Sequence, residues 1–404
     1  KCRVGGPSAE PGGRNFYIMT PMPRAEVRGA VQAGRARSFT GVSPGMTSLC
    51  VWIRRFPVGG SFALALLFLW SCGELKPEAS IPATDAPTIV RRAQMHMGTV
   101  VTLTAVAPTA SMAQQAVEAG FGEVRRLEAL LSTWIPTSEL SKVNAAAGRA
   151  PVPVGPESLL VLKRSLEIAL LTEGGFNIAL GPAIEAWSVT EQARIPTEAE
   201  LRAIHPLVEL SALHINERAG TVYLERAGMR VDVGGIGKGF AADLAATVMQ
   251  RAGATAGVVA LSGDIKTFGR LPDKARFRFG IQHPRDPGRM MATLELENEA
   301  ISTAGDYERY FERNGVRYHH ILDPRTLQPA RSCQSVTIVA KEGVMADGLD
   351  TGIFVMGPER GMALIEQLPD VEGVIVDAEG RVLVSSGLRE RVRPANPTIS
   401  PLPN

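Results

Sequence analysis

Cysteine and histidine are scarce in this sequence. Its 404 residues include four cysteines and six histidines, and no two cysteines have the Cys-x-x-Cys spacing. A zinc site is therefore not expected, because structural zinc needs closely spaced thiolates and imidazoles. His319 and His320 are adjacent in a predicted strand, so their side chains point to opposite faces and cannot bind one ion together.

The chain has no large excess of positive or negative charge, and it contains few aromatic residues. The 43 basic and 41 acidic residues leave a formal net charge of +2, and aromatic residues make up 5% of the chain. Proteins that bind nucleic acid usually concentrate basic residues and stacking aromatics on one face, so we expect no nucleic-acid partner. The hydrophobic content of 45% is enough for a large core.

The apolar run near the N-terminus is too short to cross a bilayer. Residues 62–70 are nine apolar residues preceded by Arg54 and Arg55, whereas a spanning helix needs about 20. Such a run after basic residues predicts a signal peptide. Leu69-Trp-Ser-Cys72 is similar to a bacterial lipobox, so we expect residues 46–71 to be a lipoprotein signal peptide. Cys72 would then carry a lipid anchor to the membrane, on the periplasmic side of a bacterial cell envelope. Cleavage to a plain secreted protein is the alternative.

Composition divides the rest of the chain into an extension, a linker, one folded domain and a tail. Residues 1–45 are rich in Gly, Arg, Pro and Ser and lack apolar periodicity, which predicts disorder or an extension upstream of the true start. Residues 72–92 are predicted to form a linker because Pro, Ala, Glu and Lys dominate them. We expect one folded domain over 93–390 and a tail over 391–404.

Apolar periodicity predicts an α+β fold for this domain. The predicted helices are Ala110–Leu131, Glu157–Thr172, Glu198–Ile204 and Pro358–Leu368, and the predicted strands are Arg91–Val106, Val222–Leu224, Gly257–Leu261, Arg276–Gln282, Ala292–Leu296, Val336–Ala340 and Gly373–Asp377. Short turns at Ala227-Gly228 and Pro287-Gly288 favour antiparallel pairing. We therefore expect helices packed on antiparallel-rich sheets.

The segment Asp347-Gly-Leu-Asp350-Thr351 is a candidate metal site. It falls in a predicted helix, where residues three and four apart share a face, so both carboxylates and the hydroxyl converge. Leu349, Ile353 and Met356 occupy the opposite face, toward a core. Oxygen ligands of this kind suit Mg²⁺, which usually shares its coordination shell with phosphate oxygens. The alternative is a solvated helix face.

A glycine-rich segment upstream is a candidate phosphate-binding loop. Val231-Asp-Val is followed by glycines at 234, 235, 237 and 239, and a helix is predicted from Ala241. Glycines let a ligand approach the backbone closely, and a helix N-terminus favours anions. The spacing fits neither the Walker A loop nor the GxGxxG fingerprint. A turn that only packs a helix against a sheet is the alternative.

Several motifs occur together and in a fixed order along residues 93–385. They are Met97-Gly-Thr99, Leu131 to Asn144, Gly174 to Pro182 with Trp187, Asp232 to Gly239, Leu261-Ser-Gly-Asp264, Ile301 to Arg309, Tyr318 to Pro324 and Ala346 to Thr351. In content and order this set resembles the ApbE family of FAD:protein FMN transferases. The resemblance implies an ApbE-like fold with a T-fold-like core.

The resemblance also implies an activity. The family transfers FMN from FAD, with Mg²⁺, to a threonine (or serine) hydroxyl of a partner flavoprotein through a phosphoester bond, and AMP leaves. The expected acceptor is a flavoprotein subunit of a redox complex that faces the periplasm. Two alternatives remain open. One is an Mg²⁺-dependent FAD pyrophosphatase that makes FMN and AMP, and the other is a non-catalytic flavin-binding lipoprotein.

The family pattern implies roles for individual residues. The implied metal ligands are Asp347, Asp350, Thr351 and the carbonyl of Gly235, and the implied flavin-nucleotide contacts are Met97, Trp134, Gly175, Phe176, Asn177, Asp232, Lys238, His320 and Ile321. Lys238 would add a point charge beside the diphosphate. The acceptor's proton needs a base, and Asp350 and His320 are the two candidates. Trp134 would offer a flat face for a ring, although an indole is more often a core residue.

Two positions depart from the family pattern. Asn177 stands where the family usually has aspartate, so that position carries no charge here. Leu327 follows Thr326 where a glycine is usual, which leaves the turn after Pro324 in question. Neither departure touches the implied metal ligands, so we expect an active enzyme.

Overall fold

An antiparallel sheet of eight strands forms the centre of residues 86–395, the part of the chain that the computed structural model describes. In order across the sheet, the strands are β1 (Thr88–His96), β2 (Thr99–Ala107), β6 (Ala256–Leu261), β7 (Asp264–Phe268), β10 (Ala300–Gly305), β13 (Cys333–Ala340), β14 (Val371–Asp377) and β15 (Val382–Val384). All neighbouring strands pair antiparallel. The predicted α+β class with antiparallel sheets is confirmed.

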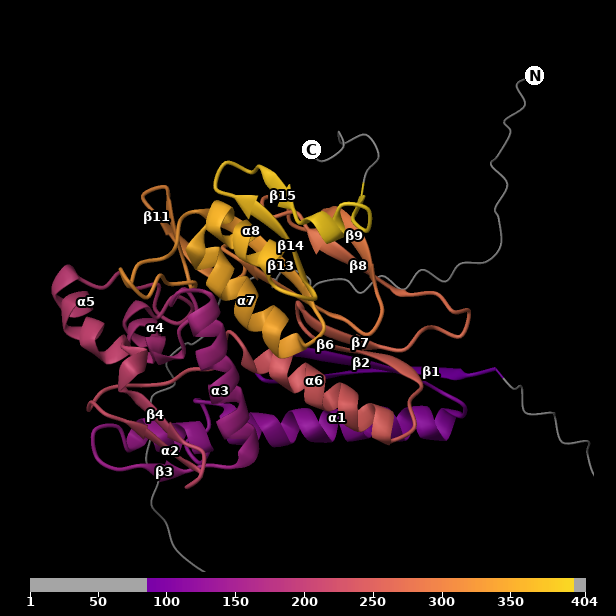
Figure 1. The fold of residues 1–404 in the computed structure, drawn as a ribbon, viewed down its shortest axis with the longest axis horizontal. Helices are drawn as coiled ribbons and strands as arrows, with labels where there is room; N and C mark the ends of the chain where they lie inside the picture. The colour runs from indigo at the N-terminus through magenta and orange to yellow at the C-terminus, as the bar shows by residue number, and fades with distance from the viewer. Residues whose placement is uncertain (1–85, 396–404) are drawn as a thin grey trace, which may run out of the picture. The chain divides into compact units, whose positions relative to one another are not determined.

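Helices cover one face of this sheet (Figure 1). They are α1 (Ala110–Leu131), α6 (Gly237–Arg251), α7 (Gly343–Met356) and α8 (Pro358–Gln367), with α3 (Pro156–Leu171) packed on α7. Strand alternation explains the arrangement, because side chains at successive positions point to opposite faces. Val259 of β6 faces the helices in the larger core, while Val258 and Ala260 face the other way.

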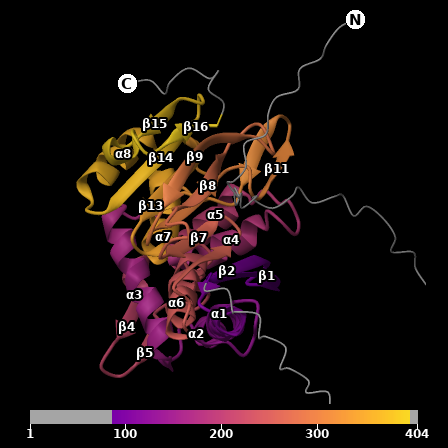
Figure 2. The same ribbon diagram turned by 90° about the vertical axis from the view of Figure 1, so that its right-hand side faces the viewer.

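A smaller sheet covers the opposite face (Figure 2). It consists of β8 (Phe277–Gln282), β9 (Met290–Leu296) and β16 (Arg393–Pro394). Phe277, Phe279 and Leu294 of this sheet pack against Val258 and Ala260, which makes a second apolar core. The eight-stranded sheet is therefore buried on both faces, and its strands β6 and β13 contain only buried residues.

The remaining helices and strands divide between the larger core and a third, smaller apolar cluster. They are α2 (Glu139–Ala145), α4 (Gly181–Trp187), α5 (Glu198–Ile204), the sheet of β3 (Val152–Pro153), β4 (Leu213–Asn216) and β5 (Thr221–Leu224), and the hairpin of β11 (Tyr310–Arg313) and β12 (Val316–His319). The cluster contains Leu180, Trp187, Leu322 and Leu327. Trp187 is fully buried and donates its indole N–H to the carbonyl of Leu327 at 2.7 Å.

Most predicted elements match the structure, and three details need correction. Residues 91–106 form a hairpin and not one strand, because Met97 and Gly98 adopt positive φ values of 50° and 69° and reverse the chain. Helix α6 begins at Gly237 and not at Ala241. Pro287-Gly288 does join two antiparallel strands, whereas Ala227-Gly228 leads from β5 into the glycine-rich loop.

The ends of the chain lie partly outside the described residues. The predicted extension (1–45), the signal peptide (46–71) with the lipid anchor at Cys72, residues 72–85 of the linker and residues 396–404 of the tail are in this category. Strand β1 begins at Thr88, within the predicted linker, and β16 lies within the predicted tail. Within residues 86–395, no helix combines the length and apolar character needed to cross a membrane.

Candidate active site

Helix α7 presents the predicted carboxylates inside the protein. Asp347 and Asp350 are only 3% and 2% exposed, so the alternative of a solvated helix face is wrong. Leu349 and Ile353 are fully buried on the other side of the helix, as their spacing predicted. Two buried carboxylates on one helix require hydrogen bonds or positive charge nearby, because an isolated charge is costly to remove from water.

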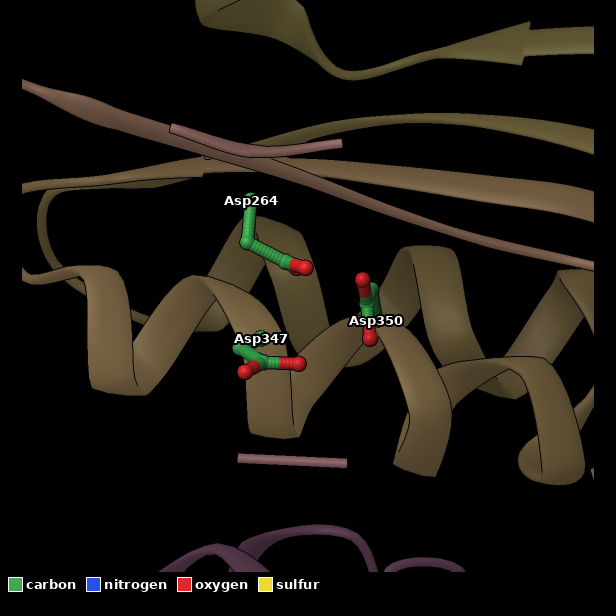
Figure 3. A group of neighbouring side chains, drawn as sticks. All are labelled: Asp264, Asp347 and Asp350. Atoms are coloured by element: carbon green, nitrogen blue, oxygen red, sulfur yellow. The ribbon is translucent and has the colours of Figure 1, made fainter. Parts of the chain in front are cut away.

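A third carboxylate, from β7, completes the group (Figure 3). Asp264 reaches toward α7 from the first position of the strand, and ligand oxygens of Asp264, Asp347 and Asp350 lie within 4.8 Å of one another. Asp264 belongs to the motif Leu261-Ser-Gly-Asp264, but no role was predicted for it. The only signal in the sequence was an acid directly after Ser262-Gly263.

A single hydroxyl group bridges two of these acids. The Ser302 Oγ lies 2.5 Å from Asp264 Oδ1 and 2.6 Å from Asp350 Oδ2. A serine hydroxyl has one proton and can donate it to only one of them. In the other short contact, the Ser302 oxygen faces a carboxylate oxygen without a proton from the serine between them. A proton on the carboxylate or a nearby cation is needed to stabilise that contact. Thr351 donates its Oγ1 proton to the other oxygen of Asp350 at 3.1 Å.

The group carries surplus negative charge. Three carboxylates face one ammonium, that of Lys238, which forms an ion pair with Asp264. Burial, reinforced by Asp347 and Asp264, raises the pKa of Asp350 well above its usual range. Burial and Asp264 likewise raise the pKa of Asp347. Burial alone would lower the pKa of Lys238, but Asp264 and Asp347 outweigh it and raise that pKa.

These residues fit a hard divalent cation. Carboxylate and hydroxyl oxygens are the ligands that Mg²⁺ prefers, and the group contains neither thiolate nor imidazole. When all three carboxylates are ionised, Lys238 compensates one of them and a divalent ion would neutralise the other two. It would also remove the conflict around Ser302. The donor set and the charge therefore agree with the predicted kind of metal.

The glycine-rich loop serves both packing and the site. A Cβ on Gly239 would collide with the carbonyl oxygen of Gly343, so this glycine lets α6 and α7 pack closely. The Gly239 N–H donates to Asp347 Oδ2 at 2.8 Å and fixes that carboxylate. Gly235 lies beside Thr351, whose Oγ1 would be 3.4 Å from an added Cβ. The packing interpretation is therefore right for Gly239, while Gly235 places open backbone next to a predicted metal ligand.

The predicted nucleotide contacts differ in exposure. Trp134 is 80% exposed, so the alternative that it is a core residue is wrong. Phe176 and Ile321 are 3% and 4% exposed and belong to the larger apolar core. Met97 occupies the β1–β2 turn, where its backbone N–H donates to Glu128 Oε1 at 2.7 Å and its Cε would lie 3.8 Å from a Cβ on Gly237. The turn thus places Met97 beside the glycine-rich loop.

Three other residues predicted to contact the nucleotide make contacts within the protein. Asn177 donates its amide to the carbonyl of Val208 at 2.9 Å, a bond that the family's aspartate could not make. Asp232 accepts from the N–H of Gly234 at 2.7 Å and from Thr133 Oγ1 at 3.1 Å. A Cβ on Gly175 would lie 2.6 Å from a carbonyl oxygen of α7, that of Gly352, so Gly175 packs the chain against the metal-site helix.

The two adjacent histidines have different partners, but β12 ends at His319, so the prediction that both lie in one strand is wrong. His319 is buried, lies 2.7 Å from the carbonyl of Ala330 and makes an edge contact with Phe354. His320 lies near Arg309, with Nδ1 at 3.3 Å from its carbonyl. Burial, together with Arg309 and His319, lowers the pKa of His320 to about 3. Its imidazole is therefore neutral at neutral pH and is a weak base.

The turn after Pro324 forms although a leucine replaces the usual glycine. Leu327 adopts φ +56°, in the left-handed region, and its N–H donates to the Asp323 carbonyl at 2.7 Å. Its side chain is fully buried beside Trp187. Burial of the leucine offsets the strain of this backbone conformation.

Fold and site together define an α+β enzyme with a buried acidic centre suited to a hard metal ion. The model of the ApbE family matches residues 97–375, and the chain belongs to this family.

Curated relatives and solved structures cover most of the chain. The FAD:protein FMN transferase of Treponema pallidum (strain Nichols) is 34% identical over 322 residues, 75% of this chain and 88% of that protein. The one from Vibrio cholerae is 34% identical over 266 residues, 64% of this chain and 79% of that protein. The crystal structure of the ApbE protein from Thermotoga maritima has a TM-score of 0.70 at 28% identity, and covers 75% of this chain and 99% of that one. The flavin transferase ApbE from Vibrio cholerae has a TM-score of 0.67 at 30% identity, and covers 76% and 99%.

Proposed function

We infer that this chain is an FAD:protein FMN transferase, an enzyme that moves FMN from FAD to a protein hydroxyl. The relatives with this name extend over most of the chain. The observation that carries the inference is the buried group of Asp264, Asp347 and Asp350. Its surplus negative charge suits a cation that would in turn hold a diphosphate.

We further propose that the cation is Mg²⁺. Asp347, Asp350, Asp264 and Thr351 would hold it, with the Gly235 carbonyl as a further oxygen ligand. When bound, Mg²⁺ supplies charge neutralisation for the diphosphate oxygens in phosphoryl transfer. Lys238 is held beside this group by Asp264 and contributes a second positive charge. Ser302 keeps two of the carboxylates at a fixed separation.

The proton of the acceptor hydroxyl goes to a base on this chain. Asp350 and His320 are the two candidates: a pKa of about 3 makes His320 a weak base, whereas burial and the neighbouring acids raise the pKa of Asp350. Exposed Trp134 offers a ring face to the flavin nucleotide.

Hydrolysis of FAD to FMN and AMP uses the same groups with water in place of the acceptor. A non-catalytic flavin carrier would need no such acidic group.

The partner and the location are part of the proposal. The acceptor is a threonine or serine of a flavoprotein subunit in a redox complex that faces the periplasm, and Cys72 anchors the enzyme to the membrane there. Labelling of growing cells with an acyl-chain analogue should mark this protein, and Cys72→Ser should abolish the label. Retained labelling in the variant would refute the anchor at Cys72.

The activity is tested with the purified protein, FAD, Mg²⁺ and a threonine-bearing acceptor fragment. We expect flavin fluorescence on the acceptor in a denaturing gel, AMP release in equal amount, and loss of both in Asp347→Ala. AMP without labelled acceptor would identify a pyrophosphatase. FAD binding without either product would identify a carrier.

His320→Gln should retain FAD binding and lose about 10²–10⁴-fold in rate if His320 is the base.

A further inference from the structure

A polar cavity lies outside the acidic site. It has a volume of about 300 Å³, and its lining includes Arg285, Arg317, Arg331 and the carboxylate of Asp306. The residues come from four places in the chain: the β8–β9 turn, β12, the segment before β13 and the end of β10. None of the candidate active-site residues lines this cavity.

The cavity carries more positive than negative charge. Asp306 forms a two-point ion pair with Arg285, at 2.6 and 2.7 Å, and its Oδ1 lies 3.4 Å from Arg317. Arg317 also pairs with Glu312 outside the cavity lining. Within residues 86–395, Arg331 has no acidic partner. Together with Glu312, two carboxylates face the three guanidinium groups, which leaves a surplus of one positive charge.

The other titratable groups of the lining add no compensating charge. Burial lowers the pKa of His319 to about 4, so its imidazole is neutral at neutral pH. Burial raises the pKa of the Cys333 thiol to about 12, so the sulfur stays protonated. The surplus positive charge is therefore present throughout the physiological pH range.

Aromatic rings hold two of the guanidinium groups in place. The Arg317 guanidinium carbon lies 4.2 Å from the centroid of the Tyr310 ring, and that of Arg331 lies 5.4 Å from the Tyr318 ring. Arg331 also donates from Nη1 to the carbonyl of Arg317 at 2.5 Å. Stacking on a ring leaves the N–H edge of a guanidinium available, and an edge fixed in advance loses less entropy on binding.

We propose that this cavity binds the phosphate group of a small molecule. The surplus positive charge attracts an anion, and arginines bind phosphate through paired N–H donors. The volume exceeds what one phosphate fills, so a phosphate monoester can also enter. Free phosphate and AMP are two sources of the same group. The AMP source rests on the proposed function, whereas the free-phosphate source does not.

The test measures binding without turnover. The purified protein is kept in EDTA, so that the acidic group holds no metal, and is titrated by calorimetry with inorganic phosphate and with AMP. Chloride at equal ionic strength is the control. We expect saturable binding and a rise in melting temperature that chloride does not reproduce. Arg331→Ala and Arg331→Gln should each weaken the affinity about tenfold or more. Arg389→Ala, an exposed arginine outside the cavity, should leave it unchanged.

The outcomes separate the possibilities. Saturable phosphate binding without AMP binding would identify free phosphate as the source, and tighter AMP binding would identify the nucleotide. Absence of saturable binding of both phosphate and AMP would overturn the proposal, as would wild-type affinity in both Arg331 variants. AMP binding that is lost in Asp347→Ala but kept in Arg331→Ala would also overturn it. Loss of FMN transfer with phosphate binding intact would count against the proposed function alone.

Discussion

At the scale of single residues, Asp264 has two tasks. It supplies one of the three carboxylates of the acidic group and it holds Lys238 in an ion pair. Asp264→Asn keeps the shape but removes one negative charge from the group. We expect FMN transfer to fall on the order of 10²-fold or more and to need more Mg²⁺. The measurement is the transfer rate as a function of Mg²⁺ concentration.

Asp273→Asn is the matched control for this change, because Asp273 is exposed in the turn between β7 and β8. It should have the Mg²⁺ response of the wild type. An Asp264→Asn variant with unchanged Mg²⁺ dependence would exclude Asp264 as a ligand.

Leu327 allows a second prediction at this scale. Leu327→Gly would relieve a left-handed backbone that costs about 1–2 kcal/mol. It would also remove a fully buried side chain, at a cost of about 2–5 kcal/mol for a leucine truncated to alanine. Burial is the larger effect, so the glycine that is usual in the family should destabilise this chain by about 1–3 kcal/mol. Urea unfolding measures the difference, and a more stable variant would mean that backbone strain dominates.

Site residues that are close together in the sequence could be predicted as a group, whereas a site residue far away in the sequence could not. Asp347, Asp350 and Thr351 could be grouped because helical periodicity relates residues three and four apart. Nothing local relates them to Asp264, which reaches the group through the pairing of β7 with β10 and the packing of α7 on β10. The exposure of Trp134 was equally unpredictable, since it depends on how the loop after α1 lies on the protein.

At the scale of elements, helix α7 depends on a cap from another helix. Asp243 of α6 accepts the N–H groups of Gly343 and Val344, at 2.8 and 2.9 Å, in the first turn of α7. Asp243→Ala would leave both groups without their partner and should destabilise the protein by about 1–3 kcal/mol. Asp243→Asn keeps one carbonyl oxygen and should lose less. Chemical denaturation of the two variants tests this order, and equal stability of wild type and Asp243→Ala would refute the capping role.

Elements with a strong single period were predicted well, and turns inside them were not. The helix at 110–131 and the short helix at 198–204 have the predicted bounds, because caps and apolar spacing agree there. The β1–β2 hairpin was taken for one strand, because apolar and polar residues continue across Met97-Gly98 without a cluster of turn residues. A single glycine within a strand pattern is not enough to predict a turn.

At the scale of the whole molecule, the buried His319 makes stability depend on pH. Its pKa in the folded protein is about 4, below the ordinary value of 6.5, so the unfolded chain binds more protons between these values. Stability from this residue is complete above pH 6.5 and is lost as the pH falls toward 4. The loss should approach on the order of 2 kcal/mol.

The difference between wild type and His319→Gln isolates this contribution from that of the buried acids. The wild type should lose its advantage in free energy of unfolding as the pH falls from 7 to 4.5, in roughly the range set by the ordinary histidine pKa and its lowered value. Denaturant titrations at four or five pH values provide the data. A constant difference over this range would contradict the buried, neutral state of His319.

The order of the acidic residues along the chain has a kinetic consequence. Lys238 and Asp264 are made first, whereas Asp350 follows Ser302 by 48 residues. Helix α6 and strand β7 can pair one ammonium with one carboxylate before α7 packs on them. Docking of α7 adds Asp347 and Asp350, so the demand for a divalent cation arises at that step of folding.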